Sequence, residues 1–213
     1  AFSLVELSIV LVILGLLVGG VLSGQSLIRA AELRAVSTEY SRYVTAVQTF
    51  RDKYFAIPGD MQNASAFWGA ADASTGSTAA CATTASTNAL TCNGNGNGLV
   101  DPSTASAEQY RFWQQLANAG LIEGTYNGIQ VSGGATAENV PRGRMSSTLW
   151  FANFWGTISA NSSFFDGNYN NALEFGSFLT GSDPRNPSLK AEEAWNLDSK
   201  LDDGRPALGK ILA

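Results

Sequence analysis

A single carboxylate interrupts the apolar stretch at the start of this chain. Glu6 lies in the segment AFSLVELSIVLVILGLLVGGVLSGQSLI, and no other charged side chain precedes Arg29. A carboxylate inside an apolar membrane helix costs about 2.5–3.5 kcal/mol, so it needs a partner or a function. The nearest fixed positive charge is the chain's own terminal amine, which a helix cannot easily fold back onto Glu6. We therefore expect the terminal amine of a neighbouring copy to pair with Glu6 and to fix the stagger of a helical array.

A second set of oxygen ligands lies in a loop rich in asparagine and glycine. Asn93, Asn95 and Asn97 alternate with glycine, as side-chain oxygens do in calcium loops. Asp101 falls at the ninth position of such a loop, and Glu108 can reach back from the helix that follows. The first position lacks an acid and the twelfth is not a glutamate. We interpret the tract as a series of Asn-Gly turns, with a calcium site on these five residues as the alternative.

The C-terminal tail is acidic as well. Asp198, Asp202 and Asp203 precede Gly204 within seven residues. We expect this turn to close a hairpin, with cation binding as the alternative.

The chain contains two cysteines and no histidine. Without histidine it lacks the commonest general base and metal ligand, and it has no G-x-S-x-G motif, P-loop or zinc spacing. We therefore expect that the chain is not an enzyme. Cys81 and Cys92 lie in a polar tract, too far apart for a CxxC motif. We predict one disulfide across a short surface loop, and hence an oxidising compartment; two free thiols are the alternative.

Composition excludes one class of partner. The net charge is −5, only 15% of residues are charged, and no run of Lys or Arg occurs. Nucleic-acid-binding proteins normally carry a clustered basic face, so we expect no nucleic-acid partner.

These residues are distributed over one long helix and a head. Residues 1–28 are apolar over a length that spans a bilayer, and residues 29–57 continue the helix with one apolar stripe. Charged residues such as Glu39 and Arg42 mostly fall off the stripe. The sequence at 57–60, Ile-Pro-Gly-Asp, ends the helix. A helix of about 55 residues is roughly 80 Å long, more than one small domain covers, so its first half must be buried in a membrane or in other subunits. The stripe consists of Leu33, Val36, Tyr40, Tyr43, Val47, Phe50 and Tyr54.

Residues 58–213 form the head. A Ser/Thr/Asn/Gly-rich tract at 73–98 predicts a long surface loop, and the spacing at 107–120 predicts a helix that ends near Gly120. Short β-like runs at 121–131, 147–155, 172–179 and 194–201 predict a small antiparallel sheet. The fold class is α+β, with the sheet lying on the helix stripe. We expect the stripe to contact sheet residues drawn from Trp150, Phe151, Phe154, Trp155, Phe175 and Trp195.

The start of the chain resembles a known motif. The residues FSLVELSIVLVILGLL, Phe2 to Leu17, resemble the processing and methylation motif of type IV pilins and type II secretion pseudopilins. In that family a prepilin peptidase cuts just before an aromatic or similar residue and methylates the new amine. A glutamate lies four residues after the aromatic, as Glu6 lies after Phe2. The family usually begins at the aromatic, whereas here Ala1 precedes it, so the modified residue is Ala1 or Phe2.

The resemblance implies the pilin fold and a structural role. The expected partners are other copies in a helical filament, the prepilin peptidase and the pilus assembly machinery. The expected location is an extracellular pilus on a bacterial cell, with an inner-membrane anchor before assembly. A pseudopilin of a periplasmic secretion pseudopilus is the alternative. A membrane-tethered enzyme or binding domain is a third class, for which the sequence offers no catalytic constellation.

Overall fold

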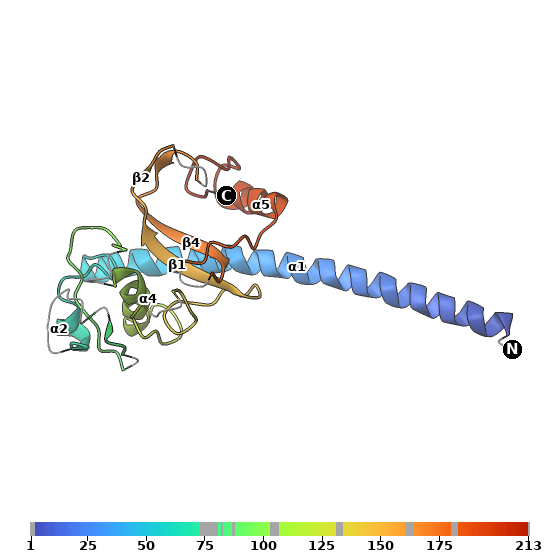
Figure 1. Cartoon of the computed structure of the whole chain (residues 1–213), viewed down its shortest axis with the longest axis horizontal. Coiled ribbons are helices and arrows are strands. Elements are labelled where there is room, and N and C mark those ends of the chain that lie inside the picture. The colour runs from blue at the N-terminus through green and yellow to red at the C-terminus, as the bar shows by residue number, and fades with distance from the viewer. Residues whose placement is uncertain are drawn as a thin grey trace.

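The computed structural model has the α+β architecture expected from the sequence, with one long helix that runs into a small head (Figure 1). It describes residues 3–72, 81, 83–86, 88–102, 107–130, 134–160, 164–179 and 183–212. The long helix and the small antiparallel sheet agree with the pilin-like fold that the N-terminal motif implies. The elements are α1 (Leu4–Tyr54), α2 (Ala64–Trp68), α4 (Glu108–Asn118), β1 (Thr148–Phe154), β2 (Thr157–Ile158), β3 (Gly167–Asn168), β4 (Asn171–Ser177) and α5 (Ala191–Leu201).

Helix α1 is continuous over 51 residues, and only its second half is covered by the head (Figure 1). It begins at the N-cap Ser3 and ends at Tyr54, because the next residue, Phe55, adopts a left-handed conformation with φ 52°. The helix therefore stops three residues before Ile57, where the sequence predicted its end. Pro58 disfavours a helical conformation at Ile57, so the helix does not resume after Phe55.

A two-stranded antiparallel sheet lies against α1. Strands β1 and β4 pair over seven residues each, with Trp150 opposite Phe175 and Ala152 opposite Leu173. Strand β1 is almost wholly buried, whereas β4 is half-buried. Both strands were predicted from their aromatic and β-branched runs, and both are confirmed. A second, shorter pair joins β2 to β3.

The aromatic stripe of α1 packs into the core of the head. Tyr43 and Phe50 are 1% and 0% exposed. The ring of Tyr43 makes edge contacts with Trp113 of α4 at 5.0 Å and with Trp150 of β1 at 5.4 Å. Phe50 instead faces Trp68 of α2, at 6.2 Å between ring centres. The stripe thus contacts α2 and α4 as well as the sheet, which extends the predicted contact.

Trp195 does not join this contact and is 53% exposed. It belongs to helix α5, so the β-like interpretation of residues 194–201 is wrong. Glu193 accepts a hydrogen bond from the backbone amide of Lys190 at 2.8 Å, and Ala, Glu and Leu in this segment favour a helix. Asp198 lies inside α5, and its C-cap is Asp202, so the predicted hairpin at the acidic tail is also wrong.

The other helix prediction in the head is confirmed and one strand prediction is not. Helix α4 ends in a Schellman turn: Gly120 has φ 71°, its amide donates to Ala117, and the amide of Leu121 donates to Leu116 at 3.0 Å. The described residues of 121–131 form bends and irregular backbone instead of a strand. Left-handed glycines at 124 and 128 break the extended conformation.

Replacing Phe50 with alanine should destabilise the head by about 3–5 kcal/mol, because the ring is fully buried and leaves a cavity. The matched control is Phe55→Ala, since Phe55 is 93% exposed five residues away. Denaturant unfolding of the full chain in detergent micelles measures both changes. Equal, small effects for the two variants would mean that the stripe does not hold the head.

Candidate functional site

Among the residues that the structure describes, none covers the first half of α1. Every Leu, Ile and Val from Leu4 to Ile28 exposes between 51% and 86% of its surface. This helix is long and apolar enough to cross a membrane, and none of its most apolar window is buried by the head. Such a surface is stable only inside a membrane or against other apolar helices.

Glu6 has a role within its own helix. The backbone amide of Ser3 donates to Glu6 Oε2 at 2.8 Å, and Ser3 Oγ accepts from the amide of Val5 at 3.2 Å. Together these bonds form a capping box that satisfies free amides at the start of α1. The sequence contained its signal, a serine followed three residues later by a glutamate. Our sequence reasoning missed it because it considered only ionic partners for the carboxylate.

The pairing of Glu6 with a neighbour's amine stays a prediction. The capping bond occupies only Oε2 of Glu6, and the carboxylate is exposed, so the cap leaves it accessible to a partner. Ala1 and Phe2, which would supply the modified amine, lie outside the described residues.

A buried carboxylate fixes the other half of α1 to the sheet. Glu39 is 6% exposed; its Oε2 accepts from the indole Nε1 of Trp150 at 2.9 Å, and its Oε1 accepts from the amide of Arg144 at 3.1 Å. The guanidinium of Arg144 lies 3.9 Å from the same carboxylate. Because a buried charge is costly unless it is hydrogen-bonded, this arrangement fixes the position of β1 along α1. Periodicity alone had placed Glu39 off the buried face.

An ion pair ties α5 to α1 where the covered part of the helix begins. Arg29 Nε donates to Glu193 Oε1 at 2.6 Å, Nη2 donates to Oε2, and Nη2 also donates to the carbonyl of Ser188 at 3.0 Å. The two parallel bonds give a planar, bidentate contact. The Arg29 guanidinium lowers the pKa of Glu193 from 4.5 to about 2. The head is therefore bonded to α1 directly next to the uncovered apolar segment of this helix.

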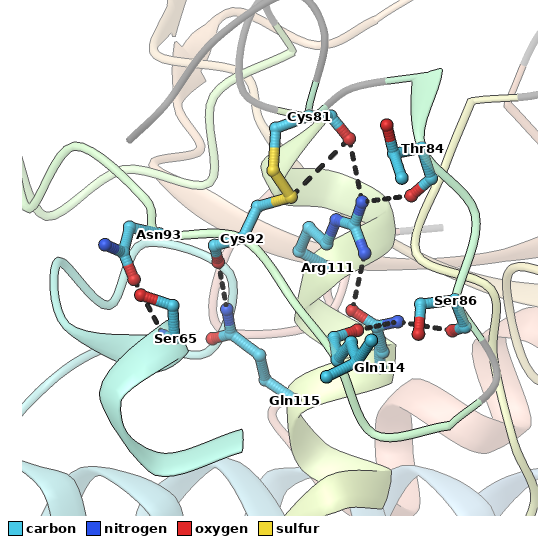
Figure 2. The surroundings of a disulfide bond; sticks show 10 residues. Ser65, Cys81, Thr84, Ser86, Cys92, Asn93, Arg111, Gln114 and Gln115 are labelled. Carbon is cyan, nitrogen blue, oxygen red and sulfur yellow. Dashed lines mark hydrogen bonds between the residues drawn. A yellow bond between two sulfur atoms is a disulfide. The ribbon is translucent and has the colours of Figure 1, made fainter. Parts of the chain in front are cut away.

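The predicted disulfide between Cys81 and Cys92 is confirmed. The two cysteines are 1% and 3% exposed, so the bond is buried. The sequence had predicted that it would lie on the outer surface, and this part of the prediction is wrong. Figure 2 shows the reason: Arg111 of α4 points into the loop, and its Nη2 donates to the carbonyls of Cys81 and Thr84 at 2.7 Å each. Gln115 donates to the carbonyl of Cys92 at 3.1 Å.

Burial lowers the pKa of Arg111 to about 10, which still leaves the guanidinium charged at neutral pH. A buried cation with no hydrogen bonds would be costly, and the loop carbonyls pair with Nη2, whereas Nε has no hydrogen-bond partner among the described residues. The contact between Arg111 and the loop joins residues 30 apart in sequence, and nothing in the local pattern of either segment predicts it.

The asparagine-glycine loop winds around a carboxylate of the helix-ending turn. Asp60 Oδ1 accepts from the amides of Gly96 and Asn97 at 2.6 and 3.1 Å, and Oδ2 accepts from Gly98 at 2.8 Å. Burial raises the pKa of Asp60, while the three amides act in the opposite direction. Sequence reasoning did not include Asp60 in this site, because it lies 36 residues before Gly96.

Glu108 reaches back to the loop as expected. Its Oε1 accepts from the amide of Asn95 at 3.1 Å, and its Oε2 accepts from the amide of Asp101 at 2.9 Å. Glu108 is fully buried, and this burial raises its pKa to about 7.

Two asparagine side chains of this loop form short-range turns, and a third contacts α2. Asn95 Oδ1 accepts from the amide of Asn97 at 2.9 Å, and Asn97 Oδ1 accepts from the amide of Leu99 at 2.8 Å. Asn93 Oδ1 accepts from the amide of Ser65 at 2.8 Å. The bonds of Asn95 and Asn97 match the interpretation as Asn-Gly turns, whereas Asn93 contacts the distant helix α2. Calcium binding by the five predicted residues stays a prediction.

Comparison with known proteins adds no assignment. No protein-family model, curated protein or solved structure matches this chain. The family resemblance of the N-terminal motif therefore stays a prediction, and the function has to be argued from the geometry.

The ion pair between Arg29 of α1 and Glu193 of α5 should weaken in acid. Because Glu193 has a lower pKa in the folded chain than its unfolded value of 4.5, its contribution is complete above about pH 4.5 and disappears as the pH falls towards about 2. The difference in unfolding free energy between the native chain and Glu193→Gln should follow this course. Glu192→Gln, at an exposed neighbouring position, is the control and should show no such pH dependence. A pH-independent difference for Glu193→Gln would contradict the ion pair.

Reducing the disulfide should lower the free energy of unfolding by about 3 kcal/mol, the value expected for a loop of this length. Denaturant unfolding with and without reductant measures the loss. A Cys81→Ser, Cys92→Ser double variant should begin at the lower stability and be insensitive to reductant. If reductant leaves the native chain unchanged, the bond does not support the head.

Proposed function

We propose that this chain is the structural subunit of a type IV pilus-like filament, assembled through its N-terminal helices. The observation that carries the proposal is the first half of α1, whose apolar side chains between Leu4 and Ile28 are all more than half exposed. Exposing each such side chain to water costs about 1.5–3 kcal/mol, so this segment is stable only in a membrane or against other copies.

Two environments suit this segment in turn. A single helix of this length and composition can lie across a membrane, which supports an inner-membrane anchor before assembly. In a filament, the same surface packs against the helices of other copies and leaves the membrane. The head does not obstruct either state, because it covers α1 only from about Arg29 onward (Figure 1).

The head supports an exported, load-bearing role. Its disulfide suits an oxidising compartment, either the extracellular space or the periplasm. The buried Glu39–Trp150 contact and the Arg29–Glu193 ion pair fix the head on α1 at two places. A force applied to the N-terminal helix is therefore transmitted to the head through hydrogen-bonded contacts, as a filament subunit requires.

Glu6 gives the assembly its register. In a bundle of otherwise apolar helices, van der Waals contacts alone leave the axial stagger poorly defined, and a buried carboxylate that must meet a positive charge selects one offset. The terminal amine of the next copy is the partner we propose, processed and methylated by a prepilin peptidase as the resemblance implies.

Replacing Glu6 with alanine should abolish assembly and leave the head folded, because in the described part of the chain the hydrogen bond of Glu6 lies within the first turn of α1, far from the head. Electron microscopy and the yield of filaments sheared from cells measure assembly, and the yield should fall at least tenfold.

The control separates the register role of Glu6 from its capping role. Ser3→Ala removes the Oγ half of the capping box, at a cost of about 1 kcal/mol, and keeps the carboxylate. This variant should still assemble. If Ser3→Ala and Glu6→Ala lose filaments equally, the cap explains the defect and the pairing is wrong.

A further inference from the structure

The end of helix α5 brings three carboxylates together. Asp198, Asp202 and Asp203 each offer an oxygen atom that lies within 4.8 Å of the others. Asp198 lies in the last turns of α5, and Asp202 is the C-cap of the same helix. Acidic groups often gather on surfaces, and such a cluster does not by itself indicate a ligand.

The burial of Asp198 is the observation that indicates a ligand. Its side chain is 0% exposed, and neither Oδ1 nor Oδ2 has a hydrogen-bond partner among the residues that the structure describes. A buried carboxylate with no partner is among the costliest arrangements in a protein. None of the ion pairs in the described part of the chain involves any of the three aspartates.

The surroundings add negative charge and leave oxygens available. The C-terminal end of a helix carries a partial negative charge, which disfavours carboxylates and favours cations. Asp202 uses Oδ2 to accept the amides of Lys210 and Ile211, and Asp203 uses Oδ1 to accept the amide of Arg205. Each keeps its second oxygen, and the exposed position of Asp203 gives solvent access to the cluster.

We propose that Asp198, Asp202 and Asp203 bind a calcium ion at the end of α5. The three residues supply only carboxylate oxygens, which suit hard cations and not zinc or copper. Ca²⁺ accepts six to eight oxygens in irregular geometry, so three carboxylates together with water molecules can fill its coordination shell. Mg²⁺ requires a near-ideal octahedron and suits this site less well. This inference does not depend on filament assembly.

The ion would also fix the C-terminal tail. Asp202 already holds the amides of Lys210 and Ile211, and Gly209 lets the tail approach, because a Cβ at this position would fall on the Asp202 carboxylate. Binding therefore connects α5 to the chain end and stabilises both.

Terbium luminescence of the full chain in detergent micelles tests the site. Tb³⁺ occupies calcium sites, and Trp195 lies three residues before Asp198 on α5, where it can excite a bound ion. We expect sensitised emission that Ca²⁺ displaces. Asp198→Asn should weaken binding at least tenfold. Trp195→Phe should remove most of the emission and leave the calorimetric Ca²⁺ affinity unchanged. At a hundredfold excess over Kd, Ca²⁺ should raise the Tm by roughly 5–10 °C.

Two further variants keep the test decisive. Asp203→Asn changes an exposed carboxylate, so it preserves folding if Asp198→Asn does not, and it should also weaken binding. Asp101→Asn, in the asparagine-glycine loop, should have no effect. Absence of emission, emission without a rise in Tm, emission that survives both α5 variants, or emission that is lost in Asp101→Asn would each overturn the proposal.

Discussion

The chain builds a helix longer than its own head can cover, and the rest of the structure depends on this imbalance. Helix α1 has 51 residues, of which the head covers only the C-terminal half. The uncovered apolar side chains would be unstable in water, because each gains about 1.5–3 kcal/mol when it is buried. The fold is thus incomplete as a single copy in water, and its stability is linked to a membrane or to other copies.

The covered half of α1 has a different role, because it holds the head in one position on a single helix. It does so with a buried aromatic face and two polar contacts. Tyr43 and Phe50 supply apolar area, while Glu39 and Arg29 supply directional bonds that prevent the head from sliding along the helix. Apolar contacts between smooth helical and sheet surfaces do not specify one position, and the polar contacts supply that specificity.

Local patterns predicted the parts of this fold that are determined locally. The apolar run and the 3–4 spacing gave α1 and the buried face of Tyr43 and Phe50, and the aromatic runs predicted β1 and β4. The cysteine spacing predicted the disulfide. Contacts between distant segments were missed: Glu39 with Trp150, Asp60 with the loop at 93–101, and Arg111 with the disulfide loop. Each pairs groups 30 or more residues apart, and periodicity carries no information about such partners. Helix α5 was missed for another reason, since a short run with apolar residues at mixed spacing fits both a strand and a helix.

The central claim is that the uncovered half of α1 becomes buried against other copies, and thiol labelling in assembled material tests it most directly. Leu16 is 73% exposed in the single chain, so a Leu16→Cys substitution reports the environment of this surface. In filaments sheared from cells, the account predicts that this thiol resists a charged maleimide and reacts only after detergent dissociates the subunits. Glu138→Cys, on the exposed surface of the head, should react in both states. Labelling of Leu16→Cys in intact filaments as fast as the head position, or absence of the chain from the sheared fraction, would contradict the account.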